Sequence, residues 1–411
     1  MHNVLSPVVL CERIVGVDDF AKKVMNKESN MDFNKEINLL KTRSLYRHRK
    51  VVEETECFPE ILINGQRKIS FASNNYLNLG DVIRSSLDLS LTKSIIQQSS
   101  PLITGYTASH AKLEEALAAL KGQEATILFS NGFVANLALL TTIVGPKDLV
   151  VLDKLNHASI MEVTKYKDIN FRIFPHKNYS YLGKILREQK AKFENIFIVS
   201  DTLFSMEGDT PDFKKLRALA QEHKAYLILD DAHATGVYGI KGAGLATKGC
   251  LKDYNKLIVT GSLSKALQSY GGFVCASRDI VEYLVNKAKP YIYNTALPQI
   301  HVESCLLALE HIEQAQVRLW KNIVYFVTSM KSVCKASYSP IIPIYMESNE
   351  HVLAASEKLS VEGVFVPAIR YPTVPKNTAL LRISLSAGHT KAQLDKLVYL
   401  LSAHQIGLNH S

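Results

Sequence analysis

Short apolar runs alternate with longer amphipathic stretches through the middle of the chain. A helical pattern runs from Ala111 to Leu120 and stops at Gly122. Another runs from Asp212 to His223, and Thr210-Pro211-Asp212 is expected to open it with a capping residue and a proline at its first position. Six runs have the length of buried strands: Ala125 to Phe129, Leu149 to Leu152, Phe171 to Phe174, Ile196 to Ser200, Tyr226 to Leu229 and Leu257 to Thr260. This alternation predicts an α/β fold, with a mostly parallel central sheet covered by helices.

The two ends of the chain follow different patterns. Residues 1–30 show no clear period, whereas a helical pattern over Asp32 to Arg49 precedes an extended segment that ends near Phe71. A helical stretch over roughly 299–335 leads to a second alternation: Ile341 to Met346, a helix from Glu350, Val364 to Ile369, Leu380 to Leu385, and a helix from Lys391. We therefore expect an N-terminal extension with a helix and strand segment (1–70), a large domain (71–300) and a small C-terminal α/β domain (301–411).

Composition narrows the class of protein. The 411 residues are 47% hydrophobic and 21% charged, which suits a globular protein with a large core. Neither an apolar stretch of membrane-spanning length nor a signal-peptide pattern is evident, so we expect a cytoplasmic protein that does not interact with membranes. The six scattered cysteines form no CxxC pair, and we expect no metal site and no disulfide framework.

The net charge of +9 suits an anionic partner, such as a phosphate-bearing cofactor, a coenzyme A tail, an acidic carrier protein or nucleic acid. The densest basic cluster, Arg43 to Lys50, falls on the predicted helix over Asp32 to Arg49 and contains a single aromatic residue, Tyr46. Because no nucleic-acid-binding motif accompanies it, we expect no nucleic-acid partner.

Two ionisable residues follow the ends of predicted strands. Lys265 comes just after the run Leu257 to Thr260, and Asp230 closes the run Tyr226 to Leu229. A buried lysine can form an imine with an aldehyde cofactor, because burial lowers the pKa of its ammonium group. A carboxylate can keep a pyridine nitrogen protonated, since the ion pair contributes roughly 4 kcal/mol at about 4 Å and an effective dielectric near 20. Together the two residues predict a pyridoxal-phosphate site.

Further polar residues could complete such a site. The turn Ser130-Asn131-Gly132-Phe133 lies between a strand and a helix, where backbone N–H groups can hold a phosphate. Ser262 and Ser264 could add hydroxyl groups to the phosphate, and His157 could lie flat against the ring. Ser205 and His233 could donate hydrogen bonds to the phenolic oxygen of the cofactor. Each of these residues also has a purely structural explanation, as a tight turn, a core histidine or a loop cap.

The order of these motifs resembles the α-oxoamine synthases, which are fold-type I pyridoxal-phosphate enzymes that condense an amino acid with an acyl thioester and release carbon dioxide. The resemblance covers roughly residues 35–405. Five blocks carry it: Ser73 to Leu77, Leu155 to Ser159, Phe204 to Asp209, Asp230 to Gly236, and Ser262 to Gly272.

The resemblance implies a role for each candidate residue. Lys265, Asp230, His157 and His233 would form the catalytic set, with Lys265 bound to the cofactor aldehyde, Asp230 at the ring nitrogen and His157 stacked on the ring. The other cofactor contacts would come from Ser205 and His233 at the phenolic oxygen, from Gly132, Phe133 and Ser262 at the phosphate, and from Thr295 at the phosphate of a second subunit. A homodimer with shared active sites is therefore implied. Asn74 and Arg382 would bind the substrate carboxylate.

Within this family, the segments 366–375 and 381–387 are most similar to the branch that makes 8-amino-7-oxononanoate for biotin biosynthesis. That branch uses L-alanine and a pimeloyl thioester of coenzyme A or acyl carrier protein, and Arg47 corresponds to an arginine that could pair with the distal pimeloyl carboxylate. The chain departs from the family pattern at Gln97 to Ile103, where a glycine-rich loop is usual, and at Asn75, Asn78 and Ala234. A sibling reaction with another amino acid or acyl thioester therefore stays open, as do the carrier and the stereochemistry.

Overall fold

The structure is a computed structural model of the 411-residue chain, and it describes residues 32–87, 99–330 and 336–407. The chain forms two compact units, Met1–Arg49 and Lys50–Ser411. The second unit contains all the strands of the described residues, in sheets of seven, four and three strands. No helix in these described ranges is long and apolar enough to cross a membrane.

The described part of the first unit contains helix α2 (Phe33–Thr42), which is shorter than predicted. It begins where Asp32 Oδ1 accepts hydrogen bonds from the backbone N–H groups of Asn34 and Lys35. It ends because Ser44 adopts a left-handed conformation (φ 54°), after which the backbone N–H groups of residues 45 and 46 both donate to the carbonyl of Leu40. The basic cluster therefore follows the helix instead of lying on it, so that part of the prediction is wrong.

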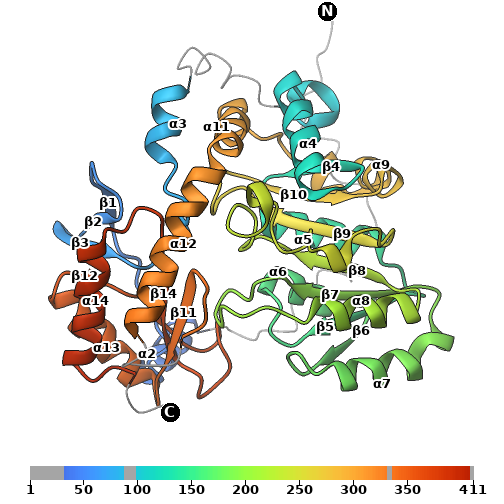
Figure 1. Cartoon of the computed structure of the whole chain (residues 1–411). Helices are drawn as coiled ribbons and strands as arrows, with labels where there is room; N and C mark the ends of the chain where they lie inside the picture. The colour runs from blue at the N-terminus through green and yellow to red at the C-terminus, as the bar shows by residue number, and fades with distance from the viewer. Residues whose placement is uncertain (1–31, 88–98, 331–335, 408–411) are drawn as a thin grey trace, which may run out of the picture. The chain divides into compact units, whose positions relative to one another are not determined.

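A seven-stranded sheet organises the second unit, in the order β4-β10-β9-β8-β7-β5-β6 (Figure 1). Its strands are β4 (Ala125–Phe129), β5 (Leu149–Asp153), β6 (Asn170–Phe174), β7 (Ile196–Asp201), β8 (Tyr226–Asp230), β9 (Leu257–Ser262) and β10 (Gly272–Ala276). All six predicted strands are confirmed. Strands β9, β8, β7, β5 and β6 are neighbours in that order, and each neighbouring pair is parallel. The seventh strand, β10, was not predicted; it begins at Gly272, directly after Gly271, and it runs antiparallel to both neighbours.

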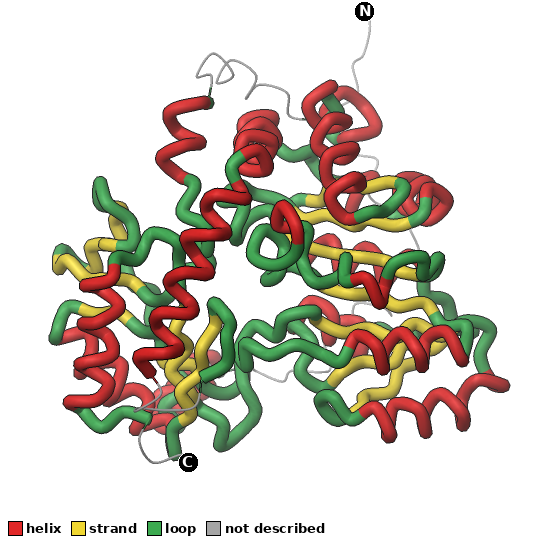
Figure 2. Tube along the Cα trace, viewed as in Figure 1, coloured by secondary structure: helices red, strands yellow, loops and turns green. Residues whose placement is uncertain are grey.

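Helices cover both faces of this sheet, as Figure 2 shows. One face packs against α4 (Ala108–Lys121), α7 (Tyr179–Gln189) and α8 (Phe213–Glu222). The other face packs against α5 (Gly132–Ile143), α6 (Ala158–Met161), α9 (Arg278–Lys287) and α10 (Lys289–Ile292). Successive residues of a strand point to opposite faces, so Val151 joins the first core and Leu152 the second.

Several helix boundaries follow the prediction and one differs. Helix α4 ends at Gly122, which has a positive φ of 62°, as expected of a C-terminal glycine. Helix α8 begins after Asp212, whose side chain accepts a hydrogen bond from the N–H of Lys215. Pro211 therefore precedes the capping residue and does not occupy the first helical position, because the Asp212 carboxylate provides the cap. The remaining short helices are α3 (Gly80–Ser86), η3 (Pro101–Gly105), η4 (Glu162–Lys165), η5 (Lys190–Lys192), η6 (Ile240–Gly242) and η7 (Gly249–Leu251).

Two smaller sheets contain the strands of the C-terminal part, and one of them also contains the three strands of residues 52–70. Strands β11 (Ile341–Tyr345), β14 (Leu380–Ser384) and β13 (Ala368–Ile369) make a three-stranded antiparallel sheet. Strands β1 (Val52–Glu54), β2 (Glu60–Ile63), β3 (Gln66–Ser70) and β12 (Val364–Phe365) make a four-stranded sheet, in which β3 and β12 are parallel. Helices α13 (Asn349–Val361) and α14 (Lys391–Ala403) complete this part.

Two elements predicted as continuous are divided. The helical stretch over 299–335 is two helices, α11 (Gln299–Glu310) and α12 (Ile312–Ser329), separated at His311, and residues 331–335 lie outside the described ranges. The run Val364 to Ile369 is divided between β12 and β13, which belong to different sheets. Pro367, which lacks an N–H group, lies between them and accepts a hydrogen bond from the N–H of Arg382. Since β3 pairs with β12, residues 50–70 pack with the C-terminal part, and the boundary expected near 300 stays a prediction.

Candidate active site

The carboxyl ends of three adjacent strands carry polar side chains at one edge of the seven-stranded sheet. Asp201 ends β7, Asp230 ends β8 and Ser262 ends β9, and Asp230 is aligned with Asp201 on one neighbour and with Thr260 on the other. Lys265 follows Ser262 by three residues. The two residues that first indicated a cofactor site therefore lie at the same edge, where ligands of α/β sheets bind.

Lys265 has the properties of a reactive amine. Burial lowers the pKa of Lys265 to about 8, although the nearby carboxylates of Asp230 and Asp201 oppose this shift. The guanidinium of Arg382 lowers the pKa of Lys265 further. A substantial share of the lysine is therefore the neutral amine near pH 8, which is the form that attacks an aldehyde.

Asp230 is held by neighbours that the sequence did not reveal. Its Oδ2 accepts a hydrogen bond from Asn136 Nδ2 at 2.7 Å, and its Oδ1 accepts one from the N–H of Ala232 at 2.9 Å. The same Asn136 amide donates to Ser159 Oγ at 2.9 Å, and that hydroxyl lies 2.7 Å from His157 Nδ1. Asn136 is a buried polar residue among the apolar residues of the first two turns of helix α5, one turn after the predicted phosphate turn, and this position was the available signal.

His157 and Asp201 form a second pair of neighbours. The backbone N–H of His157 donates to Asp201 Oδ1 at 3.1 Å, which fixes the start of helix α6 beside β7. Burial lowers the pKa of the His157 imidazole, so the ring is neutral near pH 7. Burial and then the charge of Asp230 raise the pKa of Asp201 well above its usual range. Asp201 was not predicted, although it ends a buried strand just as Asp230 does.

The predicted phosphate turn has the expected form. Helix α5 begins at Gly132, and Asn131 caps it by accepting a hydrogen bond from the N–H of Val134 at 2.9 Å. A Cβ atom added at Gly132 would lie 3.3 Å from the Cβ of Ser262, so only glycine leaves the space open at this turn. The buried Ser262 hydroxyl lies 2.8 Å from Ser264 Oγ. Helix N–H groups, a glycine and two hydroxyls fit a phosphate group.

The predicted carboxylate-binding residues also come together. Arg382 is buried on β14, where Nε donates to the carbonyl of Ser205 at 2.6 Å and Nη1 donates to Ser384 Oγ at 2.6 Å. Its Nη2 donates to Asn74 Oδ1 at 3.2 Å. Ser205 thus contacts the guanidinium through its backbone.

Tyr76 connects His233 with the Arg382 guanidinium, because its hydroxyl contacts both. The hydroxyl of Tyr76 lies 2.8 Å from His233 Nδ1 and 3.4 Å from Arg382 Nη2. Burial, and then the positive charges of Lys265 and Arg382, lower the pKa of His233 well below its usual value. His233 is therefore a neutral ring at physiological pH, able to donate one hydrogen bond and accept another.

Three further predicted site residues are Thr295, Phe133 and Arg47. Thr295 is exposed and its N–H donates to the side-chain oxygen of Asn294, whose amide donates to Ser130 Oγ at 3.3 Å. Phe133 follows Gly132 with its side chain 42% exposed. Arg47 lies in the first compact unit, and its pairing with a substrate carboxylate stays a prediction.

The departures from the family pattern have local explanations. Asn78 occupies a position where glycine is usual, and it adopts a positive φ of 51°, which asparagine tolerates better than most residues. Its N–H donates to Asn75 Oδ1 at 2.9 Å, so the two asparagines support one turn. In the segment Gln97 to Ile103, residues 97 and 98 lie outside the described ranges. The remainder leads through η3 to Gly105, where a Cβ would lie 2.3 Å from the carbonyl of Ser99.

Comparison with known proteins agrees with this geometry. The aminotransferase class I and II family matches residues 66–401. The 8-amino-7-oxononanoate synthase of Hydrogenovibrio crunogenus is 37% identical over 370 residues, covering 88% of this chain and 93% of that protein.

Two solved structures extend the comparison. The 8-amino-7-oxononanoate synthase of Francisella tularensis superposes with a TM-score of 0.69 at 29% identity, covering 82% of this chain and 97% of the other. The serine palmitoyltransferase of Sphingomonas wittichii superposes with a TM-score of 0.80 at 25% identity, covering 91% and 97%. These matches confirm the predicted fold-type I architecture. The chain therefore belongs to the aminotransferase class I and II family, on the α-oxoamine synthase branch that contains the 8-amino-7-oxononanoate synthases.

Proposed function

We propose that the protein condenses L-alanine with a pimeloyl thioester to give 8-amino-7-oxononanoate, carbon dioxide and the free thiol of the carrier. The α-carbon of alanine forms a bond to the acyl carbon as the thioester bond breaks, and the alanine carboxylate then leaves as carbon dioxide. The observation that carries the proposal is the cluster of a buried carboxylate (Asp230), a reactive amine (Lys265) and a buried guanidinium (Arg382). The 37% identity to an 8-amino-7-oxononanoate synthase supports the choice of substrates.

Pyridoxal phosphate, when bound, supplies an electron-accepting ring that stabilises negative charge at the α-carbon of the amino acid. The residues present fit it. Lys265 would hold its aldehyde carbon and Asp230, fixed by Asn136 and Ala232, would face its ring nitrogen. His157 would pack flat on the ring as a neutral imidazole, in line with its lowered pKa.

The phosphate and the phenolic oxygen would be held by separate groups. Gly132, Phe133 and Ser262 would donate to the phosphate from the turn at the start of α5 and the end of β9. His233 and Ser205 would lie near the phenolic oxygen. Thr295 would reach the phosphate of a second subunit, which makes the active form a homodimer, and the exposure of Thr295 in the single chain is compatible with such a contact.

Lys265 would also move the proton at the reacting carbon. Once the amine of the amino acid has replaced it, the free lysine would remove the α-proton and later return a proton to the same carbon. A pKa of about 8 supports both steps, because a general base works best when its pKa lies near the operating pH.

Substrate carboxylates would be recognised by arginines. Arg382 would bind the carboxylate of L-alanine through the Nη2 edge that now faces Asn74, with Asn74 as the second donor. Arg47 would pair with the distal carboxylate of the pimeloyl chain, as the resemblance implies.

The second candidate is a sibling reaction that uses another amino acid or acyl thioester. The similarity to a serine palmitoyltransferase favours it, as does the replacement of the glycine-rich loop by residues 97–103. A pyridoxal-phosphate aminotransferase would instead release a keto acid without a thioester.

Mass spectrometry of the products distinguishes these reactions. Cofactor-loaded protein is mixed with pimeloyl-coenzyme A, or with pimeloyl acyl carrier protein, and an equimolar panel of alanine, glycine and serine. We expect one alanine-derived amino ketone with loss of carbon dioxide, and Lys265→Ala should abolish it while Lys241→Ala, at an exposed lysine, should not. A product that forms only with another acyl donor or amino acid would favour the sibling reaction. A keto acid formed without a thioester would overturn both the proposed condensation and the sibling reaction.

A further inference from the structure

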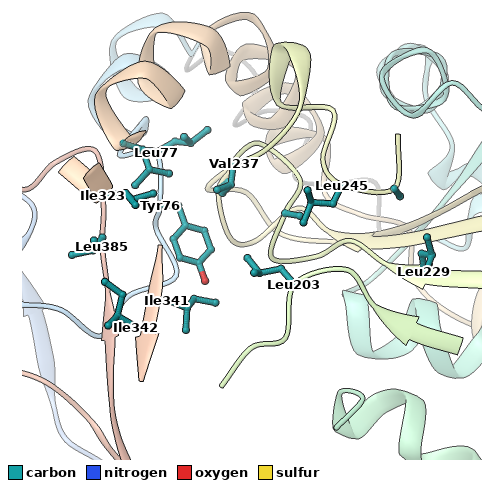
Figure 3. Close-up of a cluster of buried hydrophobic side chains, with 14 of the residues drawn as sticks. Tyr76, Leu77, Leu203, Leu229, Val237, Leu245, Ile323, Ile341, Ile342 and Leu385 are labelled. Atoms are coloured by element: carbon teal, nitrogen blue, oxygen red, sulfur yellow. The ribbon is translucent and has the colours of Figure 1, made fainter. Parts of the chain in front are cut away.

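The hydroxyl of Tyr76 is the meeting point of groups from distant parts of the chain. Tyr76 is fully buried, and Figure 3 shows its ring between Ile342 and Leu385 on one side and Leu203 and Val237 on the other, with Ile341 near its hydroxyl end. Its hydroxyl lies 2.8 Å from His233 Nδ1, 3.3 Å from Asn74 Oδ1 and 3.4 Å from Arg382 Nη2. Tyr76 has no role among the predicted site residues.

The hydrogen bonds of this hydroxyl depend on where its one hydrogen points. The guanidinium of Arg382 can only donate, so the Tyr76 oxygen accepts from it and its hydrogen points elsewhere. Two acceptors are within reach, Asn74 Oδ1 at 3.3 Å and His233 Nδ1 at 2.8 Å. We assign the hydrogen to His233 Nδ1, because that contact has the usual length of a bond from a hydroxyl group and the contact with Asn74 is longer. In the opposite arrangement, Nδ1 would donate to Tyr76 and the hydroxyl would donate to Asn74.

We propose that Tyr76 is a positioning residue that keeps His233 in the tautomer with its hydrogen on Nε2. Because Nδ1 accepts the tyrosine hydrogen, a neutral His233 must carry its own hydrogen on Nε2, which is then the donor left for the phenolic oxygen of the cofactor. This inference rests on the proposed function, in which His233 contacts that oxygen.

The same hydroxyl joins two parts of the proposed site. Arg382 would bind the substrate carboxylate, and His233 would hold the cofactor, and within the described residues the Tyr76 hydroxyl contacts both of them. The charged and titratable groups that affect His233 are Lys265, Arg382 and His157, and all three lower its pKa. Loss of the tyrosine hydrogen bond to the neutral ring would raise the pKa of His233, since that bond stabilises the neutral form.

Nitrogen-15 NMR of histidine-labelled, cofactor-loaded protein tests the tautomer directly. The His233 resonance is identified by its loss in His233→Asn among the 13 histidines of the chain. We expect Nδ1 of His233 to show the shift of an unprotonated ring nitrogen and Nε2 that of a protonated one. A wild-type protein with the hydrogen on Nδ1 would overturn the proposal, whatever happens in any variant.

Tyr76→Phe removes the hydroxyl and keeps the buried ring. We expect the two His233 tautomers to mix, the acidic limb of the activity profile to move to higher pH, and kcat to fall about tenfold. The KM for L-alanine should change by less than about threefold, because Arg382 keeps its bonds to Ser205, Ser384 and Asn74.

Tyr254→Phe is the matched control. Tyr254 is a partly buried tyrosine whose hydroxyl donates to the carbonyl of Ala225 and has no contact with Tyr76, His233 or Arg382 among the described residues, so its loss should leave the His233 resonances and kcat unchanged. Unchanged resonances, or an unchanged kcat, in Tyr76→Phe would overturn the proposal. If the wild-type protein forms no product from L-alanine and a pimeloyl thioester, the proposed function fails, while the NMR result still decides the tautomer.

Discussion

Replacement of Lys121 by methionine should destabilise the protein strongly, because Lys121 forms a fully buried ion pair with Asp231. The side chains of both residues are 0% exposed, and Lys121 Nζ lies 2.7 Å from Asp231 Oδ2. Lys121 Nζ also donates to Thr235 Oγ1 at 2.7 Å and to the carbonyl of Ala243 at 2.8 Å. Methionine keeps the length of the side chain but removes the charge and all three hydrogen bonds.

The expected loss follows from what remains around Asp231. Removal of one partner of a buried ion pair costs about 3–5 kcal/mol, because the other charge is left without compensation. Asp231 Oδ1 would keep three donors, which are the Thr202 hydroxyl and the N–H groups of Leu245 and Ala246. We therefore expect the lower end of the range, about 3 kcal/mol of unfolding free energy. Asp231 directly follows Asp230, and Thr202 directly follows Asp201. The ion pair of Lys121 and Asp231 therefore also stabilises the sheet edge that carries the site.

Urea unfolding followed by the fluorescence of the single tryptophan, Trp320, measures this loss. The midpoint for Lys121→Met should move to clearly lower urea than that of the wild-type protein. Lys391→Met is the matched control, because Lys391 lies at the same distance of 2.7 Å from Asp395 but on the surface, with side chains 70% and 46% exposed. Solvent screens that pair, so its loss should leave the midpoint nearly unchanged. Equal midpoints for the two variants would refute the argument that burial decides the strength of the pair.

Four further predictions concern the site and its surroundings. Pyridoxal phosphate should bind to cofactor-free protein faster as pH rises through about 8, because burial lowers the pKa of Lys265 to about 8 and only the neutral amine reacts. Stopped-flow absorbance measures the binding rate at each pH, and a rate that rises with a midpoint near the pKa of free lysine, about 10.4, would contradict this prediction. Arg382→Lys should raise the KM for L-alanine about tenfold or more without changing the cofactor absorbance, since lysine cannot make a bidentate contact, and an unchanged KM would exclude Arg382 as the carboxylate site. Gly272→Ala should weaken cofactor binding in a fluorescence titration, because its Cβ would lie 2.4 Å from the backbone of Asn131, whereas Gly249→Ala, with nothing within 4 Å, should not. Burial alone would lower the pKa of His176, but hydrogen bonds to Asp153 and Asp209 raise it to about 9. The stabilisation from its charge is therefore fully present below pH 6.5 and is lost as pH rises through 9. His176→Gln should remove this pH dependence from urea midpoints between about pH 7 and 10, and a profile identical to that of the wild-type protein would refute the prediction.

The sequence alone was enough for features that depend on neighbours in the chain. Six strands were located because each contains a short apolar run, and four of them, β5, β7, β8 and β9, are buried along almost their whole length in the parallel part of the sheet. Asp230 and Lys265 were found because each follows such a run directly, and the carboxyl ends of parallel strands meet at one edge. Where a local signal was ambiguous, as at Gly271 and Gly272 at the start of β10 or at His311 between α11 and α12, prediction failed.

The tertiary structure decided the contacts between residues far apart in the chain. The hydrogen bonds of Asp230 with Asn136 and of Tyr76 with His233 join residues 94 and 157 positions apart, and no local pattern specifies such pairs. The pairing of β3 with β12 likewise attaches residues 66–70 to the C-terminal part, because an edge strand needs a partner wherever the chain supplies one. Periodicity encodes which face of an element is buried, but the identity of the neighbour across that face emerges only when the whole chain packs together.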